Sequence, residues 1–332
     1  MRHQYIARDS AAVVTERLIA DQWVGVLYAS VREQSPFLFK LLTSARMSAL
    51  LGCLQFDSVH TSARKMIRRL GVDPLECLAP MNQLNSPRKV FERKICYWRC
   101  RPLPLQESDI VAPADSRMLV GSFRSESQVF VKEKFFDFEQ LLGANKVSWL
   151  SAFHHGGYAV FRLTPEKYHY SHTPVSGRVI DFYDISGAYH SCNPSAVVEM
   201  AQPYSKNKRV VTIIDTDVAG GTGVGLVAMI EVVALMIGDI LQCYSEARYD
   251  EPVGITPGMF LKKGQPKGLF RPGSSVVILI FQEHRIEFCE DILLNLHRTD
   301  VVSRFSAGFG QTLVETEVNV RSKIAYGSAA PC

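Results

Sequence analysis

The sequence has no excess of charge of either sign: 37 Lys and Arg residues face 33 Asp and Glu residues, giving a net charge of +4 at pH 7. Proteins that bind nucleic acid usually gather basic residues on one face, whereas the basic residues here are scattered. Weak attraction to an anionic membrane is compatible with this balance. Repeats and low-complexity segments are also missing, and 47% of the 332 residues are hydrophobic. We therefore expect a globular protein with no nucleic-acid partner.

Paired cysteines are missing as well. The eight cysteines form no Cys-x-x-Cys pair, and Cys96 and Cys100 are the two closest. Without a second pair or nearby histidines, a zinc site is not expected. The charges between Met1 and Asp9 are not followed by an apolar run, so we expect no secretory signal. Reduced thiols in a cytoplasmic compartment are the default expectation.

One apolar stretch, Gly223 to Leu241, has about the length of a membrane span. It carries Glu231 and Asp239 and follows a glycine-rich turn. Acidic side chains are costly inside a membrane. We therefore interpret the stretch as a buried segment of a soluble protein, with a true span as the alternative.

The chain changes character near residue 105. Before it, apolar residues recur at three- and four-residue spacing and predict helices over Ala11–Gln34, Pro36–Leu54 and Ser62–Leu70. We expect residues 1–105 to form a helical N-terminal region. Its apolar stripes could lie on a membrane, with Arg32, Lys40 and Arg46 facing lipid head groups, or they could pack on the rest of the protein.

Residues 106–332 show short apolar runs separated by turn residues, which favours β-structure. The sequence thus predicts an α+β fold, with N-terminal helices packed on a β-rich core. The candidate strands are Arg117–Phe123, Val129–Val131, Tyr158–Arg162, Gly177–Tyr183, Arg209–Asp215, Val224–Val233, Ile237–Tyr244 and Val276–Phe281.

The first candidate motif is the Gly273-Ser274 junction, which precedes the apolar run Val276–Phe281. Most such serines are turn residues. The junction could also support self-cleavage, because glycine lets its carbonyl be approached closely and an activated serine hydroxyl could attack it. The amide would become an ester, and elimination followed by hydrolysis would leave an N-terminal pyruvoyl group at position 274.

Two further motifs carry candidate side chains. His169 and His172 lie three residues apart before a predicted strand. They could act in acid–base chemistry, bind a metal with a third ligand such as His154, or do neither. Asp115 follows Pro113-Ala and could be a turn former, or it could be the carboxylate that orients a histidine.

Taken in order, the three motifs resemble the signature of phosphatidylserine decarboxylases. That family shows a Pro-x-Asp segment, a Tyr-His-x-x-His-x-Pro-x-x-Gly segment and a Gly-Ser-Ser or Gly-Ser-Thr cleavage site before an apolar strand. The matching segments here begin at Pro113, Tyr168 and Gly273. Further stretches also match in order, and the similarity covers roughly residues 35 to 330. These stretches are Phe91–Lys94 with Arg101-Pro102, Phe135–Gly143, Asn207–Arg209 and Gly308–Glu315.

The resemblance implies a role for each site residue. Asp115, His172 and Ser274 would form the self-cleavage triad, with His172 as the base and Asp115 holding its imidazole. Cleavage would give chains 1–273 and 274–332, which stay associated as parts of one sheet system. The substrate amine would form a Schiff base with the pyruvoyl cofactor made from Ser274, and His169 would donate the proton after CO2 leaves. No metal is implied.

The family also implies a phospholipid substrate, phosphatidylserine, which is converted to phosphatidylethanolamine and CO2. A homodimer and peripheral contact between a cytoplasmic protein and a membrane are further expectations. Three positions depart from the commoner family residues: Tyr170 stands where Arg is frequent, Ser116 where Gly is frequent, and Ser275 where Thr is commoner. None of these removes a reacting group, but Tyr170 puts contacts to the substrate phosphate in doubt.

Three alternatives stay open at this point. A pyruvoyl-dependent decarboxylase of a soluble amino acid would share the same chemistry. A serine hydrolase could use Asp115, His172 and Ser274 as a triad, but it usually places its serine on a sharp turn between strand and helix. An inactive binding protein would have no reason to keep all three residue types.

Overall fold

The computed structural model describes residues 1–56, 62–124, 135–200, 202–235, 239–273 and 275–328. Its strands are β1 (Gln4–Ala7), β2 (Ala12–Thr15), β3 (Asp109–Val111), β4 (Ser116–Ser122), β5 (Gly157–Leu163), β6 (Tyr170–His172), β7 (Gly177–Ile185), β8 (Arg209–Asp215), β9 (Leu226–Val233), β10 (Ile240–Gln242), β11 (Phe260–Leu261), β12 (Pro266–Phe270), β13 (Ser275–Phe281), β14 (Ile286–Phe288), β15 (Thr316–Val318) and β16 (Lys323–Gly327).

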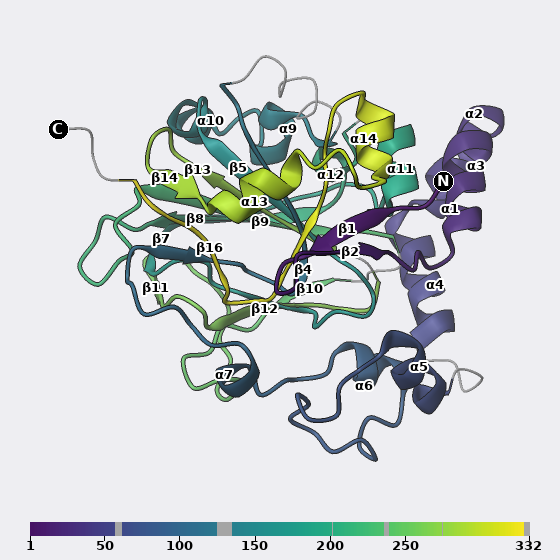
Figure 1. Ribbon diagram of the computed structural model, residues 1–332, viewed down its shortest axis with the longest axis horizontal. Coiled ribbons are helices and arrows are strands. Elements are labelled where there is room, and N and C mark those ends of the chain that lie inside the picture. The colour runs from purple at the N-terminus through teal and green to yellow at the C-terminus, as the bar shows by residue number, and fades with distance from the viewer. Residues whose placement is uncertain (57–61, 125–134, 201, 236–238, 274, 329–332) are drawn as a thin grey trace.

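Most helices come before residue 101 or after residue 289 in the sequence. In space they lie around the sheets (Figure 1). They are α1 (Asp21–Val26), the π-helix η1 (Leu27–Val31), α2 (Arg32–Gln34), α3 (Pro36–Leu42), α4 (Ala45–Phe56), α5 (Ala63–Leu70), α6 (Pro87–Phe91), α7 (Tyr97–Cys100), α9 (Phe138–Leu142), α10 (Val147–Phe153), α11 (Pro194–Glu199), α12 (Pro203–Lys206), α13 (Glu290–Leu296) and α14 (Arg304–Phe309).

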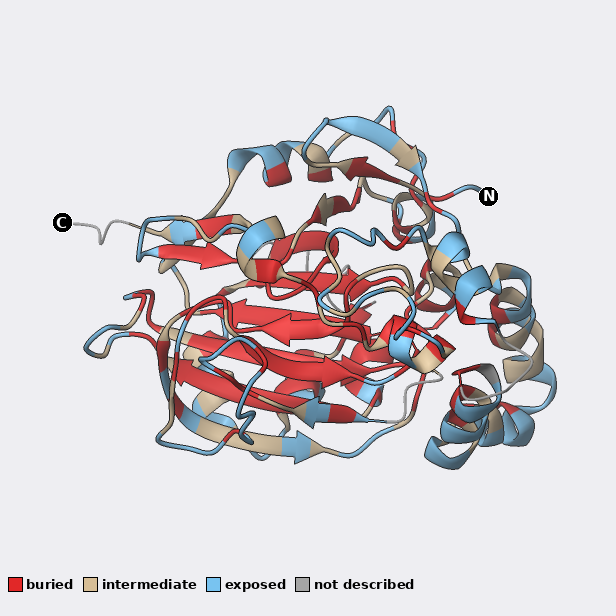
Figure 2. Ribbon diagram, turned by 90° about the horizontal axis from the view of Figure 1, so that it is seen from below, coloured by how far each residue is buried: buried red, intermediate tan, exposed pale blue. Residues whose placement is uncertain are grey.

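A ten-stranded sheet forms the centre of the molecule, in the order β11-β7-β8-β9-β13-β5-β4-β15-β1-β2. Its neighbouring strands are antiparallel except for the parallel pair β1 and β15. Every residue of β13 is buried, which accounts for the unbroken apolar run after Ser275. Figure 2 shows the middle strands as almost entirely buried. The mixed architecture agrees with the predicted α+β class.

The part of the chain after Gly273 is woven into the part before it. Strand β13 lies between β9 and β5, β15 lies between β4 and β1, and β16 pairs with β3. Each of these three strands therefore hydrogen-bonds to strands that precede residue 273. This is the interleaving expected for two chains that stay associated, although the structure shows one continuous fold and not the cut itself.

The predicted helix over Ala11–Gln34 is wrong in its first part. Ala12–Thr15 is strand β2, which pairs with β1 as an antiparallel hairpin, and the first helix begins only at Asp21. Val13 and Val14 are β-branched and favour a strand when a partner strand is available. The partner strand, Gln4–Ala7, has no alternation of apolar and polar residues from which it could have been predicted.

The other predicted elements agree more closely. Pro36–Leu54 forms helices as predicted, but as α3 and α4, which bend by 58° at their junction. Strand β8 has the predicted bounds Arg209–Asp215, and β13 begins one residue earlier than predicted. The predicted strand Val129–Val131 lies outside the described residues, as does the beginning of Ile237–Tyr244.

The stretch Gly223–Leu241 contains strand β9 in the middle of the sheet, so it is a buried segment, as interpreted. In the part of the chain that the structure describes, no single helix has the length and apolar character needed to cross a membrane. The bent pair α3 and α4 meets that criterion only when its two helices are taken together.

Candidate active site

The Gly273-Ser274 junction lies between β12 and β13. Gly273 is buried and has φ +149°, a conformation that residues with a side chain rarely adopt. Ser274 lies outside the described residues. The next residue, Ser275, is paired with Leu163 on one side and Val233 on the other. The strand that begins at Ser275 is thus held from both sides.

Strand pairing brings the histidine motif to the same region. His172 pairs with Pro266, and Tyr170 pairs with Leu269, in the small sheet β10-β12-β6. The amide of Phe270 also donates to the carbonyl of His169 at 3.0 Å. Strand β6 therefore lies along the strand that leads into the junction, which joins two motifs that are about one hundred residues apart in the sequence.

His172 is fully buried, and both of its ring nitrogens have partners. Nδ1 lies 2.9 Å from the carbonyl oxygen of Gly264, and Nε2 lies 2.9 Å from the hydroxyl of Tyr168. A carbonyl oxygen can only accept, so Nδ1 carries the hydrogen and Nε2 presents its lone pair to Tyr168. Burial lowers the pKa of His172 to about 3. The ring is therefore neutral at pH 7, which is the state a general base needs.

His169 is also fully buried, but one of its nitrogens has no partner. Nδ1 donates to the carbonyl of Lys167 at 2.8 Å, whereas Nε2 has no hydrogen bond among the described residues. The ring packs on Phe91, with 3.7 Å between ring centroids. Burial, with a smaller contribution from Arg93, lowers the pKa of His169 to about 3. Its Nε2 thus has a lone pair that accepts no hydrogen bond from the described residues, and the atom is shielded from solvent.

Asp115 forms no hydrogen bond with His172 among the described residues, and its expected role toward that imidazole stays a prediction. Its two carboxylate oxygens accept from the guanidinium of Arg101 at 3.0 and 2.8 Å, and Oδ1 also accepts from the amide of Val320 at 2.7 Å. Burial alone would raise the pKa of Asp115, but the hydrogen bonds and charge of Arg101 hold it below its ordinary value. Asp115 acts on both histidines only through its charge, and the Gly264 carbonyl sets the tautomer of His172.

A fully buried ion pair, which the sequence analysis missed, adjoins the histidine strand. Nζ of Lys267 lies 2.6 Å from Oε2 of Glu231, and Gln242 contacts both partners. Ser171, between the two histidines, donates to the other oxygen of Glu231. A side chain at Gly268 would clash, since a Cβ there would lie 2.5 Å from that oxygen. The one sequence signal was an acidic residue inside an apolar strand, which requires a partner.

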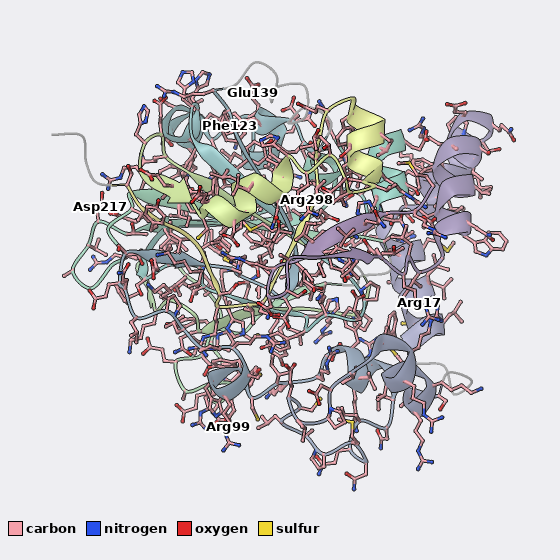
Figure 3. The ribbon with its side chains drawn as sticks, in the orientation of Figure 1. Arg17, Arg99, Phe123, Glu139, Asp217 and Arg298 are labelled. Atoms are coloured by element: carbon pink, nitrogen blue, oxygen red, sulfur yellow. The ribbon has the colours of Figure 1, made fainter. Side chains whose placement is uncertain are left out.

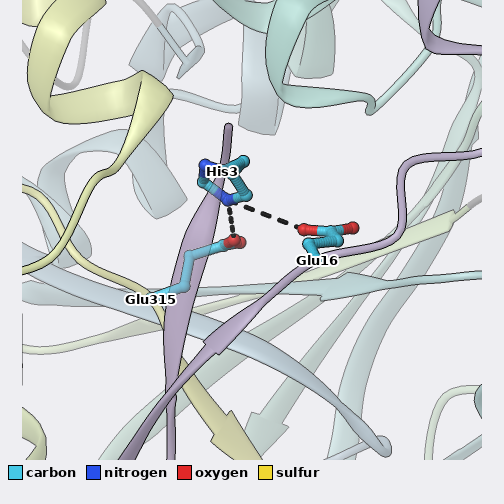
Figure 4. Close-up of side chains that lie close together, drawn as sticks. All are labelled: His3, Glu16 and Glu315. Carbon is cyan, nitrogen blue, oxygen red and sulfur yellow. Dashed lines mark hydrogen bonds and ion pairs between the residues drawn. The ribbon is translucent and has the colours of Figure 1, made fainter. Parts of the chain in front are cut away.

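A second buried cluster joins the two ends of the chain. Nε2 of His3 lies 2.8 Å from Glu315 and 3.6 Å from Glu16, and the three residues approach within the range needed to hold a metal ion (Figure 4). However, Arg162 donates to both carboxylates. Arg117 also pairs with Glu16. Because two guanidinium groups already balance the two negative charges, we assign the cluster as an ion-pair network and not as a metal centre.

A pocket of about 370 Å³ borders the junction at Gly273. Its walls come from the stretch between β2 and α1, from α4 and α5, from the end of β5 and from the loop before α11. The lining is mostly apolar, and Leu18, Ile19, Val24, Phe56 and Leu163 are among its residues. A mostly apolar pocket with a few polar groups is the usual form of a small-molecule site.

Comparison with known proteins gives one family. The family model described as phosphatidylserine decarboxylase matches residues 88–305. The phosphatidylserine decarboxylase proenzyme of Chlamydia pneumoniae is 31% identical over 294 residues, which are 88% of this chain and 91% of the relative. The proenzyme of Ruminiclostridium cellulolyticum is 27% identical over 84% of this chain and 87% of the relative.

A plant relative is longer. Phosphatidylserine decarboxylase proenzyme 2 of rice is 34% identical over 231 residues, which are 68% of this chain. The match covers 33% of the rice protein, so this chain corresponds to about a third of it.

Proposed function

Since the chain belongs to the phosphatidylserine decarboxylase family, we propose that it converts phosphatidylserine to phosphatidylethanolamine and CO2, using a pyruvoyl group made by self-cleavage at Gly273-Ser274. The position of the junction carries the proposal. The junction opens a central strand, borders an apolar pocket and lies at the end of the strand that pairs with the histidine motif.

Self-cleavage uses atoms of the chain alone, together with one water. Oγ of Ser274 attacks the carbonyl carbon of Gly273, the C–N bond between the two residues breaks, and an ester replaces the amide. Loss of the α-proton of Ser274 then expels the new carboxylate of Gly273. Water finally replaces the nitrogen at position 274, which leaves as ammonia.

The two histidines divide the proton transfers in this proposal. His172 takes the proton of the Ser274 hydroxyl at Nε2, the nitrogen that carries its lone pair. For this transfer the Ser274 hydroxyl has to replace the Tyr168 hydroxyl that contacts Nε2 in the structure. Nε2 of His169 carries a lone pair in the structure and has no partner among the described residues. It takes up the proton that the ammonium group of the bound substrate releases and delivers it to the carbon atom that loses the carboxylate.

The residues around the junction fit a pyruvoyl group at position 274. Ser275 Oγ and His169 Nε2 are both buried without a hydrogen-bond partner in the described part of the chain, and both are therefore available to a new polar group. When present, the pyruvoyl carbonyl would condense with the substrate amine and withdraw the electrons left by the departing carboxylate. Strand β13 would hold its position.

Two alternative functions fit the structure less well. A decarboxylase of a soluble amino acid would have little use for the apolar walls of the pocket. A serine hydrolase needs the carboxylate to orient the histidine, yet Asp115 is bound to Arg101.

The test of this function is intact-mass spectrometry of the purified protein beside its Ser274→Ala variant. We expect two chains from the wild type, residues 1–273 and 274–332, with the second blocked at its N-terminus, and one uncut chain from the variant. The wild type should then release CO2 from phosphatidylserine and not from free serine. A wild type that stays uncut would overturn the proposal.

We further propose that the N-terminal helices contact the membrane that supplies the substrate. Figure 1 shows α1 to α4 along one side of the molecule. They present exposed apolar side chains to solvent, including Trp23 and Phe37 with exposed fractions of 79% and 83%. Lys40 and Arg46 lie on the same helices, so apolar groups and cations are combined, as on interfacial helices.

A double variant tests this contact. Replacing Phe37 and Leu41 with Ser should weaken co-sedimentation with phosphatidylserine-containing vesicles, by roughly tenfold for each apolar side chain that enters the lipid. Leu294→Ser, on α13, is the matched control because Leu294 is also exposed (65%) but lies on another element. Equal binding by the double variant and this control would contradict the membrane contact.

The site of action and the assembly are also proposals. The seven cysteines in the described residues are free thiols, which supports a protein acting at the cytoplasmic side of a membrane. The family resemblance supports a homodimer, and light scattering of the purified protein in detergent would measure it.

A further inference from the structure

Three cations line the pocket beside the cleavage junction without a carboxylate partner. Arg17, Lys65 and Arg69 all contribute to the pocket lining, and none of their side chains forms a hydrogen bond or ion pair with another described residue. Some arginines of the described chain are paired, such as Arg101 with Asp115 and Arg304 with Asp21, and other exposed ones are not. What distinguishes these three cations is that they line the same pocket. Unpaired cations gathered around one pocket create a positive potential that selects an anionic ligand.

The three residues come from two segments that meet at the pocket. Lys65 and Arg69 lie four residues apart on α5 and therefore on one face of that helix. Arg17 lies on the stretch between β2 and α1, where it is labelled in Figure 3. All three are exposed. The other two basic residues of α5, Arg64 and Arg68, are also exposed but do not line the pocket.

The pocket lining contains three kinds of group that together match one kind of ligand. Gly273 and the polar residues Thr164, Ser191 and Asn193 line it, where an amine and a carboxylate would meet the junction. The cations line it as well, alongside apolar residues such as Met66 and Leu70. A ligand with an amino acid at one end, a phosphodiester next to it and an apolar remainder satisfies all three sets of groups.

Tyr170 does not supply the phosphate contact. Its ring stacks on Tyr168 at 5.4 Å and contacts Tyr249 at 5.1 Å, and it does not line the pocket. A cation for the substrate phosphate must therefore come from elsewhere in the chain.

We propose that Arg17, Lys65 and Arg69 form the phosphate subsite of this pocket and bind the phosphodiester of phosphatidylserine. The inference rests on the proposed function and adds the residues that distinguish a phospholipid from a free amino acid. Arginine and lysine both bind phosphate through charge-assisted hydrogen bonds, arginine through two at once. Since the cations are exposed, each should contribute modestly and the set should act together.

The test compares two double variants of the same helix. K65A/R69A removes the two cations that α5 places at the pocket, and R64A/R68A removes the same charge from the rest of α5. The substrate is dihexanoyl phosphatidylserine in neutral detergent, so that attraction to a charged membrane plays no part. For K65A/R69A we expect KM to rise roughly tenfold or more, because two charge-assisted contacts are lost, with kcat changed less than about twofold. R64A/R68A should keep the KM of the wild type, and K65R/R69K should restore most of the loss.

Both double variants should still be cut completely, as intact mass will show, because the subsite takes no part in cleavage. Equal KM values for K65A/R69A and R64A/R68A would overturn the phosphate subsite. A wild type that is neither cut nor active would instead overturn the proposed function. In that case, calorimetric binding of glycerophosphoserine to the Ser274→Ala protein, with and without K65A/R69A, still decides the subsite: equal binding refutes it.

Discussion

His172→Ala is expected to leave the chain uncut, whereas His169→Ala is expected to be cut normally and then to decarboxylate poorly. In His172 the Gly264 carbonyl fixes the hydrogen on Nδ1, which leaves Nε2 as the basic nitrogen. Removing a general base typically slows a reaction by roughly 10²- to 10⁴-fold. Cutting should therefore nearly stop in His172→Ala. Intact mass measured over days, followed by an assay for phosphatidylethanolamine, distinguishes the two effects.

The control for this pair is His155→Ala, which removes an exposed histidine and should change neither step. The structure also gives a reason to consider that the two histidines have the opposite roles. Nε2 of His169 has no partner among the described residues, whereas Nε2 of His172 is engaged by Tyr168. If His169→Ala stays uncut and His172→Ala is cut, the two histidines have the opposite roles. If both are cut and active, neither is the base.

Lys267→Met is expected to lower the free energy of unfolding by about 3–5 kcal/mol, because it leaves Glu231 as an unpaired charge in a fully buried site. The double variant Lys267→Met with Glu231→Gln should be less destabilised, since both charges are then removed. Urea unfolding should be measured in the Ser274→Ala background, where the protein is one chain and the transition has a defined reference state.

Lys262→Met provides the matched control. Lys262 pairs with Glu246, but both side chains are about half exposed. Surface pairs usually contribute less than about 1 kcal/mol, so this variant should unfold close to the parent. If Lys267→Met and Lys262→Met lose the same stability, the buried pair has no special part in holding β12 against β9. Because Ser171 also contacts Glu231, Lys267→Met should slow cutting as well.

The sequence predicted the parts of the fold that depend on local patterns. Apolar runs gave the central strands, with correct bounds at β8, and Pro36 marked the start of α3. The motif order also identified the junction and the histidine pair, which β6 and β12 bring together. The strand bounds and the helix start agree with the structure because the residues that specify each element are neighbours in the chain.

Contacts between distant residues could not be predicted in the same way. Strand β1 forms because β2 and β15 flank it, and β15 lies about three hundred residues away. Asp115 was expected beside His172, but its carboxylate is bound by Arg101, and this contact has no sequence signature. Helix α5 likewise carries four basic residues, and its sequence does not distinguish them. Only the fold shows that two of them, Lys65 and Arg69, line the pocket that Gly273 also lines.

The interleaving of the strands makes self-cleavage depend on folding. The histidine strand and the junction meet only after β6 has paired with β12 and β13 has entered the sheet between β9 and β5. On the proposed mechanism, the chain is therefore cut only after these strands have folded. A molecule that misfolds keeps an ordinary serine at position 274, and the reactive carbonyl arises only in molecules that already have a rigid site to contain it.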